Sequence, residues 1–280
     1  MRSKILFSAV AALAAVTSAS AADLGNGKKA PPAPVVVSPW EWTVGAGVTS
    51  NYIFRGISQS NNKPSFNANA ELRYVINDNY ALYVGAAGSS VKLTNQNQSP
   101  PVEWDFMGGL RTTYGAFTVD LGAVAYRYEK TVNAIFATTP NWYEGYVKTT
   151  YAVNDAFTVG VNAFVSPSYL DTGPSSQYYS ATAAYKLGDL QFSGELGRQL
   201  LGRQNATHGS LKMPDYTYYN VGASYAYKIA TLDLRYHGSD ISKYGCYTIT
   251  NTTGVANQSK YCGGAVVGTL SFALTNKDVK

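Results

Sequence analysis

The sequence is poor in charge and, beyond its first residues, has no apolar run long enough for a membrane-spanning helix. Asp, Glu, Lys and Arg make up 14% of the 280 residues, against about 25% in ordinary soluble domains. A spanning helix needs about 18 consecutive apolar residues, and no such run follows residue 22. Low charge without such a run is typical of a transmembrane β-barrel, because its apolar side chains occupy alternate positions of each strand.

Groups that commonly carry catalysis or bind metals are also scarce. The chain has two histidines and two cysteines, no spacing typical of a metal site and no Gly-x-Ser-x-Gly motif. His237 and Ser239 share a strand face, as the base and nucleophile of outer-membrane phospholipases do, but Asp233 and Arg235 lie on the same face, which therefore points away from lipid. We predict no catalytic residue, no cofactor, no metal and, without a basic patch, no nucleic-acid partner.

The first 22 residues have the three-part layout of a secretory signal peptide. Arg2 and Lys4 form a basic start, an apolar run covers residues 5–16, and small residues follow up to Ala22. The alternative is a membrane anchor, but about twelve apolar residues are too few to cross ~30 Å of hydrocarbon. We therefore predict cleavage after Ala21 or Ala22 and export to the bacterial outer membrane.

The mature chain divides into a linker and a barrel. Residues 23–40 carry four prolines and no periodicity, which favours an extended segment in the periplasm. In the remainder, 41–280, segments of about ten residues alternate apolar and polar positions. In one of them Phe66 and Leu72 share a face, while Glu71 and Arg73 share the other. This period of two predicts an all-β fold.

The connections between these segments alternate strictly between short and long. Long polar stretches cover residues 56–64, 90–100, 129–140, 167–176, 200–214 and 241–261. An outer-membrane barrel has this asymmetry, with tight periplasmic turns and longer external loops, whereas a soluble β-sandwich has no reason for it. We predict an antiparallel transmembrane β-barrel of twelve strands, at about 41–55, 65–76, 80–89, 101–114, 116–128, 141–152, 156–166, 177–187, 189–199, 215–227, 230–240 and 262–274.

The polar faces of the strands supply the candidate lumen residues. By strand parity these are Arg55, Glu71, Arg73, Glu103, Asp105, Arg111, Asp120, Glu144, Lys148, Lys186, Glu195, Asp233, Arg235 and His237. Their charges are nearly balanced, so they fit either a charged lumen that selects polar solutes or an interior salt-bridge network that plugs the barrel. Twelve strands lie between the eight that leave room only for side chains and the sixteen that leave a channel.

Aromatic residues near the predicted strand ends suit the girdles that barrels place at the two membrane interfaces. The alternative for these residues is an ordinary place in a core. The residues concerned are Trp42, Tyr52, Trp104, Trp142, Tyr216 and Tyr219.

Cys246 and Cys262 lie in or beside the last long loop. In an exported chain two such cysteines are expected to form a disulfide, which in the chain-entropy model would contribute up to ~3 kcal/mol for a loop of this length. Metal binding is the less favoured alternative, since no histidine lies nearby.

Residues 50–64 carry a motif that resembles the opening of the TorF family of porin-like proteins from proteobacteria. The run is Ser-x-Tyr-x-Phe-Arg-Gly-Ile-Ser-Gln-Ser from Ser50 to Ser60, followed by Pro64. The resemblance is confined to the first hairpin and implies an outer-membrane porin-like barrel. In this motif Gly56 allows the chain to turn, and Arg55 is expected either to pair with an inward carboxylate or to bind an anionic solute.

These observations favour an outer-membrane channel for passive diffusion of small hydrophilic solutes, with outer-membrane lipid and lipopolysaccharide as its surroundings. A non-conducting structural or surface barrel is the main alternative, and a lipid hydrolase is a weaker one. A soluble periplasmic sandwich is disfavoured by the alternation of loop lengths.

Overall fold

The computed structural model describes residues 38–93, 101–129, 141–206, 210, 212–250 and 259–279. The predicted signal peptide and nearly all of the predicted linker lie outside these residues.

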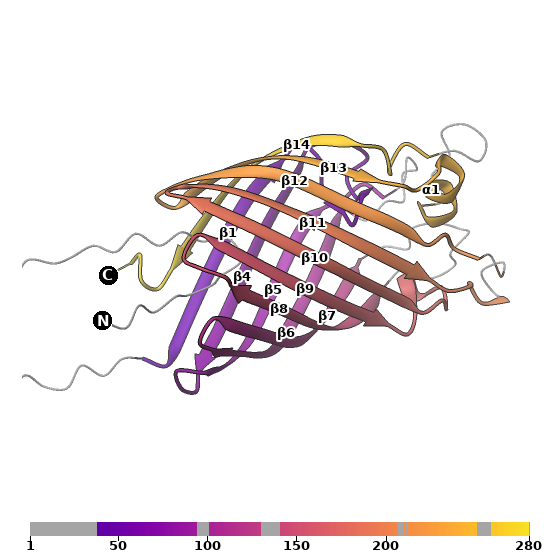
Figure 1. The fold of residues 1–280 in the computed structure, drawn as a ribbon. Coiled ribbons are helices and arrows are strands. Elements are labelled where there is room, and N and C mark those ends of the chain that lie inside the picture. The colour runs from indigo at the N-terminus through magenta and orange to yellow at the C-terminus, as the bar shows by residue number, and fades with distance from the viewer. Residues whose placement is uncertain are drawn as a thin grey trace, which may run out of the picture.

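Twelve antiparallel strands form a closed barrel, as the sequence predicts (Figure 1). The first strand pairs with the last, so that Thr43 lies opposite Thr275. Closure leaves no free strand edge, which is required where no water can satisfy the backbone. The strands are β1 (Trp40–Thr49), β4 (Ser65–Val75), β5 (Tyr80–Ser90), β6 (Val102–Tyr114), β7 (Phe117–Tyr128), β8 (Trp142–Ala152), β9 (Phe157–Ser166), β10 (Ser176–Leu187), β11 (Leu190–Leu201), β12 (Tyr216–Tyr227), β13 (Ala230–Ser239) and β14 (Ala265–Thr275).

The first predicted strand, 41–55, is too long. The barrel strand β1 ends at Thr49, and the next residues form a separate two-stranded hairpin of β2 (Ile53–Phe54) and β3 (Ile57–Ser58). The hairpin turns at Arg55 and Gly56, whose φ angles of 46° and 83° are both positive. Two successive positive φ angles are the signature of a tight hairpin turn, and alternation of apolar and polar residues does not reveal them.

The two ends of the barrel differ, as the alternation of loop lengths predicts. The turn end carries the short connections, together with the start of β1 and the end of β14 (left in Figure 1). The loop end carries the longer connections, including the β2–β3 hairpin, the short 3₁₀ helix η1 (Tyr169–Asp171) and α1 (Lys243–Thr250), on the right of Figure 1. Among the described residues, no helix is both long and apolar enough to span a bilayer.

The outer face of the barrel is apolar. Side chains such as Phe66, Val84, Leu196, Leu234 and Val266 are between 59% and 68% exposed, and they alternate along their strands with less exposed neighbours. An exposed apolar surface on every strand is expected of a barrel that contacts lipid and is unusual for a soluble monomer.

The girdle prediction is wrong for half of the aromatic residues named for it. Trp142 and Tyr216 are 4% and 1% exposed and belong to a cluster inside the barrel, and Tyr52 donates its hydroxyl to Glu103. Trp104 and Tyr219, in contrast, are about two-fifths exposed on the outer face. Position near a strand end therefore identifies an end of the barrel, while strand parity decides which face the ring occupies.

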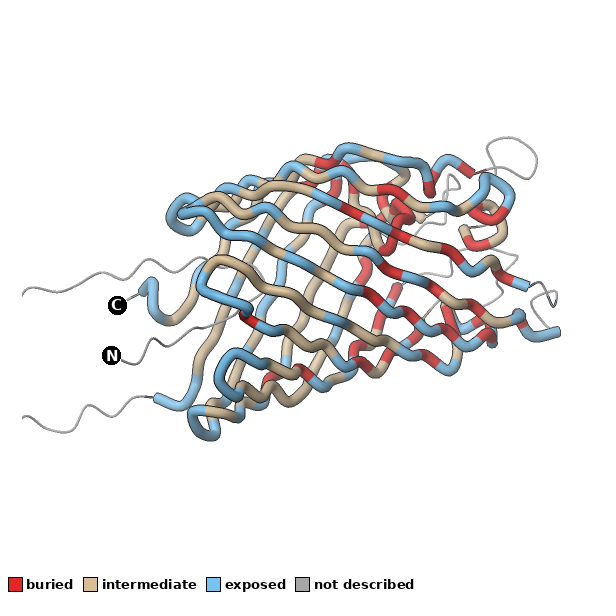
Figure 2. The backbone as a smooth tube through the Cα atoms, viewed as in Figure 1, coloured by how far each residue is buried: buried red, intermediate tan, exposed pale blue. Residues whose placement is uncertain are grey.

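Burial is concentrated at the loop end. Most buried segments gather on the side of α1, and the turn-end half is mostly intermediate or exposed (Figure 2). Cys246 of α1 and Cys262 form the predicted disulfide, with their Cα atoms 5.8 Å apart. The barrel is thus more densely packed at its loop end than at its turn end.

Candidate functional site

The β2–β3 hairpin carries Arg55 into the interior of the barrel at its loop end. Arg55 is 7% exposed. A Cβ atom added to Gly56 would lie 3.1 Å from both the Ser239 and the Tyr218 side chains, so the hairpin tip is also in close contact with β12 and β13. Any side chain at position 56 would displace these neighbours, so glycine is the residue that fits. The positive φ of Gly56 also favours glycine.

Arg55 makes a bidentate ion pair with Glu144 on β8. Both of its terminal nitrogens lie 2.8 Å from a Glu144 carboxylate oxygen, and one also donates to Gln199 of β11 at 3.2 Å. In the strand order, β8 is separated from β1 by four strands on one side and six on the other. The pair therefore joins the hairpin to the far wall and crosses the barrel.

Aromatic rings surround the same guanidinium group. Its central carbon lies 4.7 Å from the Phe54 ring centroid, 4.8 Å from that of Phe164 and 4.2 Å from that of Tyr178, distances at which a cation is attracted to the ring face. Burial alone lowers the pKa of Arg55, but the Glu144 carboxylate more than offsets this and raises it overall. The guanidinium therefore stays charged, and Glu144 balances that charge.

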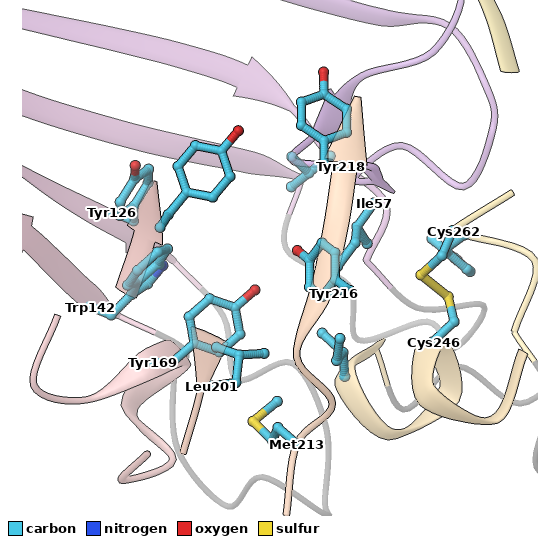
Figure 3. Close-up of a cluster of buried hydrophobic side chains, with 14 of the residues drawn as sticks. Ile57, Tyr126, Trp142, Tyr169, Leu201, Met213, Tyr216, Tyr218, Cys246 and Cys262 are labelled. Atoms are coloured by element: carbon cyan, nitrogen blue, oxygen red, sulfur yellow. A yellow bond between two sulfur atoms is a disulfide. The ribbon is translucent and has the colours of Figure 1, made fainter. Parts of the chain in front are cut away.

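A cluster of buried apolar side chains closes around the hairpin and is called the loop-end cluster here (Figure 3). In the close-up, Tyr126, Trp142 and Tyr169 lie together on one side, and the disulfide lies beside α1 on the other. The cluster includes Ile57 from the hairpin, side chains of the barrel wall and side chains of the loops. Its buried members are Ile57, Val91, Val124, Tyr126, Tyr128, Trp142, Tyr146, Tyr169, Tyr178, Leu201, Met213, Tyr216, Tyr218, Cys246, Ile249, Tyr261 and Cys262.

Towards the turn end the interior carries charged side chains, some of them partly exposed. Arg111 lies 3.1 Å from Asp120 and 3.4 Å from Glu71, and Lys148 lies 3.6 Å from Asp120. The Lys148 side chain is 39% exposed and that of Glu71 30%. These pairs form a chain of alternating charges along the wall.

A second interior network lies on β11 to β13. Arg235 lies 3.0 Å from Asp233 and donates to Asn220 at 2.6 Å. Asn220 in turn donates to Glu195 at 3.2 Å, and Tyr178 donates to Glu195 at 2.8 Å. Asn220 therefore links three of the predicted lumen residues, and the charge-based prediction left out both Asn220 and Tyr178.

The other predicted residues are placed as follows. Arg73 pairs with Glu41, Lys186 is exposed in β10, and Glu103 and Asp105 lie on one face of β6. His237 makes a hydrogen bond with Tyr218 at 2.9 Å, and Ser239 donates to the Cys262 carbonyl at 3.1 Å. Because each has its own partner, His237 and Ser239 do not form the nucleophile–base pair that a hydrolase requires.

Sequence reasoning missed Gln199 and the aromatic rings around Arg55. Gln199 is 1% exposed and donates to Ser176 at 2.7 Å, which holds its oxygen towards Arg55. It lies four residues after Glu195 and so shares its inward face. A parity count that included uncharged polar residues would have found it.

The fold resembles solved membrane barrels at low sequence identity. An outer-membrane channel from Pseudomonas putida F1 is 11% identical with a TM-score of 0.53, and the match covers 88% of this chain and 100% of that one. A chain from work on in-meso crystallisation of membrane proteins is 10% identical with a TM-score of 0.52, covering 85% and 84%. A NanC porin is 11% identical with a TM-score of 0.49, covering 83% and 100%.

No curated protein matches the sequence. At these identities the structural likenesses show the barrel fold alone. The family, in contrast, is shown by sequence: a family model described as "Bacterial protein of unknown function (Gcw_chp)" matches residues 34–264, which is most of the chain. The chain belongs to this family.

Proposed function

We propose that the protein is an outer-membrane channel for passive diffusion of small hydrophilic solutes, narrowed at its loop end by the β2–β3 hairpin. The observation that carries the proposal is the Arg55–Glu144 pair, which crosses a barrel with an apolar outer face and charged, partly exposed side chains in its interior. An interior charge network beneath a narrow mouth suits polar solutes of limited size.

Size rather than charge would set the selectivity of this mouth. Glu144 neutralises Arg55 at the hairpin, and the flanking groups are aromatic. Beyond the constriction, Arg111, Asp120 and Lys148 present both signs of charge to the solvated interior. A solute that passes the hairpin therefore meets no strong field of one sign, which favours small neutral or zwitterionic polar molecules.

The proposed orientation has the loop end outside the cell and the turn end in the periplasm, with outer-membrane lipid and lipopolysaccharide around the apolar face. It rests on the usual asymmetry of outer-membrane barrels, on the predicted signal peptide and linker, and on the description of the Pseudomonas putida neighbour as an outer-membrane channel. The Ser50–Ser60 motif supports a further proposal, that the chain is related to the TorF porin-like proteins. Proteobacterial origin rests on the same motif.

Single-channel recording in a planar bilayer tests this function. Wild-type protein is expected to pass current, and Arg55→Ala is expected to pass more, because loss of the ion pair frees the hairpin from β8. Arg198→Ala is the matched control, since Arg198 pairs with Asp240 and both are about half exposed. No rise in the time-averaged current through Arg55→Ala would contradict the role of the hairpin as the constriction.

A non-conducting surface barrel is the second candidate, and the loop-end cluster is the observation that favours it. Seventeen buried apolar residues pack around the hairpin, and packing of this extent resembles a permanent core more than a loosely held lid. Absence of current from folded wild-type protein over prolonged recording would contradict the channel and favour this candidate.

A further inference from the structure

A small cavity lies within the loop end, between the β2–β3 hairpin, η1 and α1. Its volume is about 70 Å³, several times what a single water needs. Six aromatic side chains contribute to its wall, and the aliphatic ones include Ile57, Leu170 and Ile249. The aromatic residues are Phe54, Tyr126, Tyr128, Trp142, Tyr169 and Tyr261, and the space is called the aromatic cavity here.

The wall of the aromatic cavity includes one carboxylate, that of Glu103. Glu103 is 3% exposed and accepts hydrogen bonds from the Tyr52 hydroxyl at 2.6 Å and from the Tyr128 hydroxyl. Neither donor carries a positive charge. The ion pairs between described residues include neither Glu103 nor Asp105, which lies two residues further along the same face.

The Arg55 guanidinium does not supply the missing positive charge. Arg55 stacks on Phe54, which lines the cavity, but its guanidinium is bound at both nitrogens by Glu144. One oxygen of Asp105 is buried with no hydrogen-bond partner among the described residues. Among the described residues, the Glu103 carboxyl in the cavity wall therefore has no cationic partner, and a buried carboxylate is costly unless a cation balances it.

A hydrogen-bond donor in the same wall is also unused. Trp142 is 4% exposed, and within the described part of the chain its indole nitrogen has no acceptor. The ring is held firmly, stacked on Tyr126 at 4.4 Å and edge-on to Tyr169 at 5.0 Å. A buried N–H group without a partner is rare in native structures, and here it lies in the wall of a cavity that could hold an acceptor.

We propose that the aromatic cavity binds a small alkylated ammonium ion that also carries a hydroxyl group, as choline does. The aromatic faces attract the cation, Glu103 balances its charge, and the Trp142 N–H donates to its oxygen. A hydrated inorganic cation fits less well, because magnesium and calcium take six or more oxygen ligands and this wall is largely apolar. The inference is independent of whether the barrel conducts.

Isothermal titration calorimetry of the folded full-length protein in detergent micelles tests the site with choline as the probe. The matched probe is 3,3-dimethylbutan-1-ol, which has the shape of choline without its charge. Choline is expected to bind at least about tenfold more tightly than the neutral alcohol, a difference in Kd that corresponds to about 1.4 kcal/mol. Equal affinities, or no detectable binding of choline to folded protein, would overturn the proposal.

Two variants locate the binding. Glu103→Gln keeps an acceptor for one of the two tyrosine hydroxyls and removes the charge, so choline affinity is expected to fall about tenfold or more. Asp155→Asn, in the turn after β8 at the opposite end, is the acidic control and is expected to bind as wild type does. If Glu103→Gln does not fold, Tyr169→Leu replaces it, since it removes one aromatic wall without touching the carboxylate. Choline binding unchanged in the folded variant would contradict the assignment.

Discussion

Removal of Arg55 should destabilise the barrel far more than removal of an arginine from its surface. In Arg55→Ala, Glu144 stays in place with a side chain that is 0% exposed, and the Tyr126 hydroxyl, 3.1 Å away, is the one donor left to it among the described residues. A buried charge left without its partner costs about 3–5 kcal/mol. Arg198→Ala should cost less than about 1 kcal/mol, because the pair of Arg198 with Asp240 is exposed to solvent.

Equilibrium unfolding in guanidinium chloride, with the protein refolded into lipid vesicles, measures both values. A double-mutant cycle with Glu144→Ala separates the ion pair from the loss of packing, and the expected coupling energy is about 1–3 kcal/mol. Arg55→Gly is an internal check. Arg55 has a φ of 46°, a conformation that costs a non-glycine residue about 1–2 kcal/mol, so glycine should be less destabilising than alanine at this position. If Arg55→Ala lowers the free energy of unfolding by less than about 1 kcal/mol and shows no coupling to Glu144, the view that this buried pair holds the hairpin is refuted.

Three further predictions concern other parts of the molecule. Reduction of the Cys246–Cys262 disulfide should lower the free energy of unfolding by about 3 kcal/mol. It should also speed tryptic cleavage between β13 and β14, measured by mass spectrometry. Equal cleavage with and without reductant would argue against a stabilising role of the disulfide. Gly56→Ala should cost about 1–2 kcal/mol of unfolding free energy because of its positive φ and close neighbours, whereas Gly145→Ala, where an added Cβ meets nothing within 4 Å, should cost little. Leu234→Arg, at a side chain 61% exposed on the outer face, should destabilise the protein in lipid by about 2–4 kcal/mol, and a neutral result would contradict contact with the bilayer core.

The barrel could be read from the sequence because two simple rules govern it. Strand parity separated outward residues such as Leu72 from inward ones such as Glu71, and the alternation of short and long connections gave the number of strands. Both signals are local and repeat along the whole chain, so an error in one segment does not spoil the count.

The packed loop end could not be read in the same way. The hairpin turn depends on backbone conformation at Arg55 and Gly56, and the Arg55–Glu144 pair joins residues 89 positions apart in the chain. Neither has a periodic signature. The sequence suggested that Arg55 would meet an inward carboxylate, but which carboxylate depends on the distance from the hairpin to the far wall, and only the closed barrel sets that distance.

The same ion pair predicts how the proposed channel would behave in time. If release of the hairpin costs about 3 kcal/mol, the open state is populated below about 1%, since each 1.4 kcal/mol is a factor of ten. Wild-type current should then consist of brief, rare openings, and Arg55→Ala should raise the fraction of time spent open by tenfold or more without changing the amplitude of each opening. A rise in amplitude at constant open fraction would instead mean that Arg55 obstructs a pore that is always open. Single-channel records distinguish the two, because one alters dwell times and the other alters conductance. The hairpin is thus a releasable closure only if its effect appears in the dwell times.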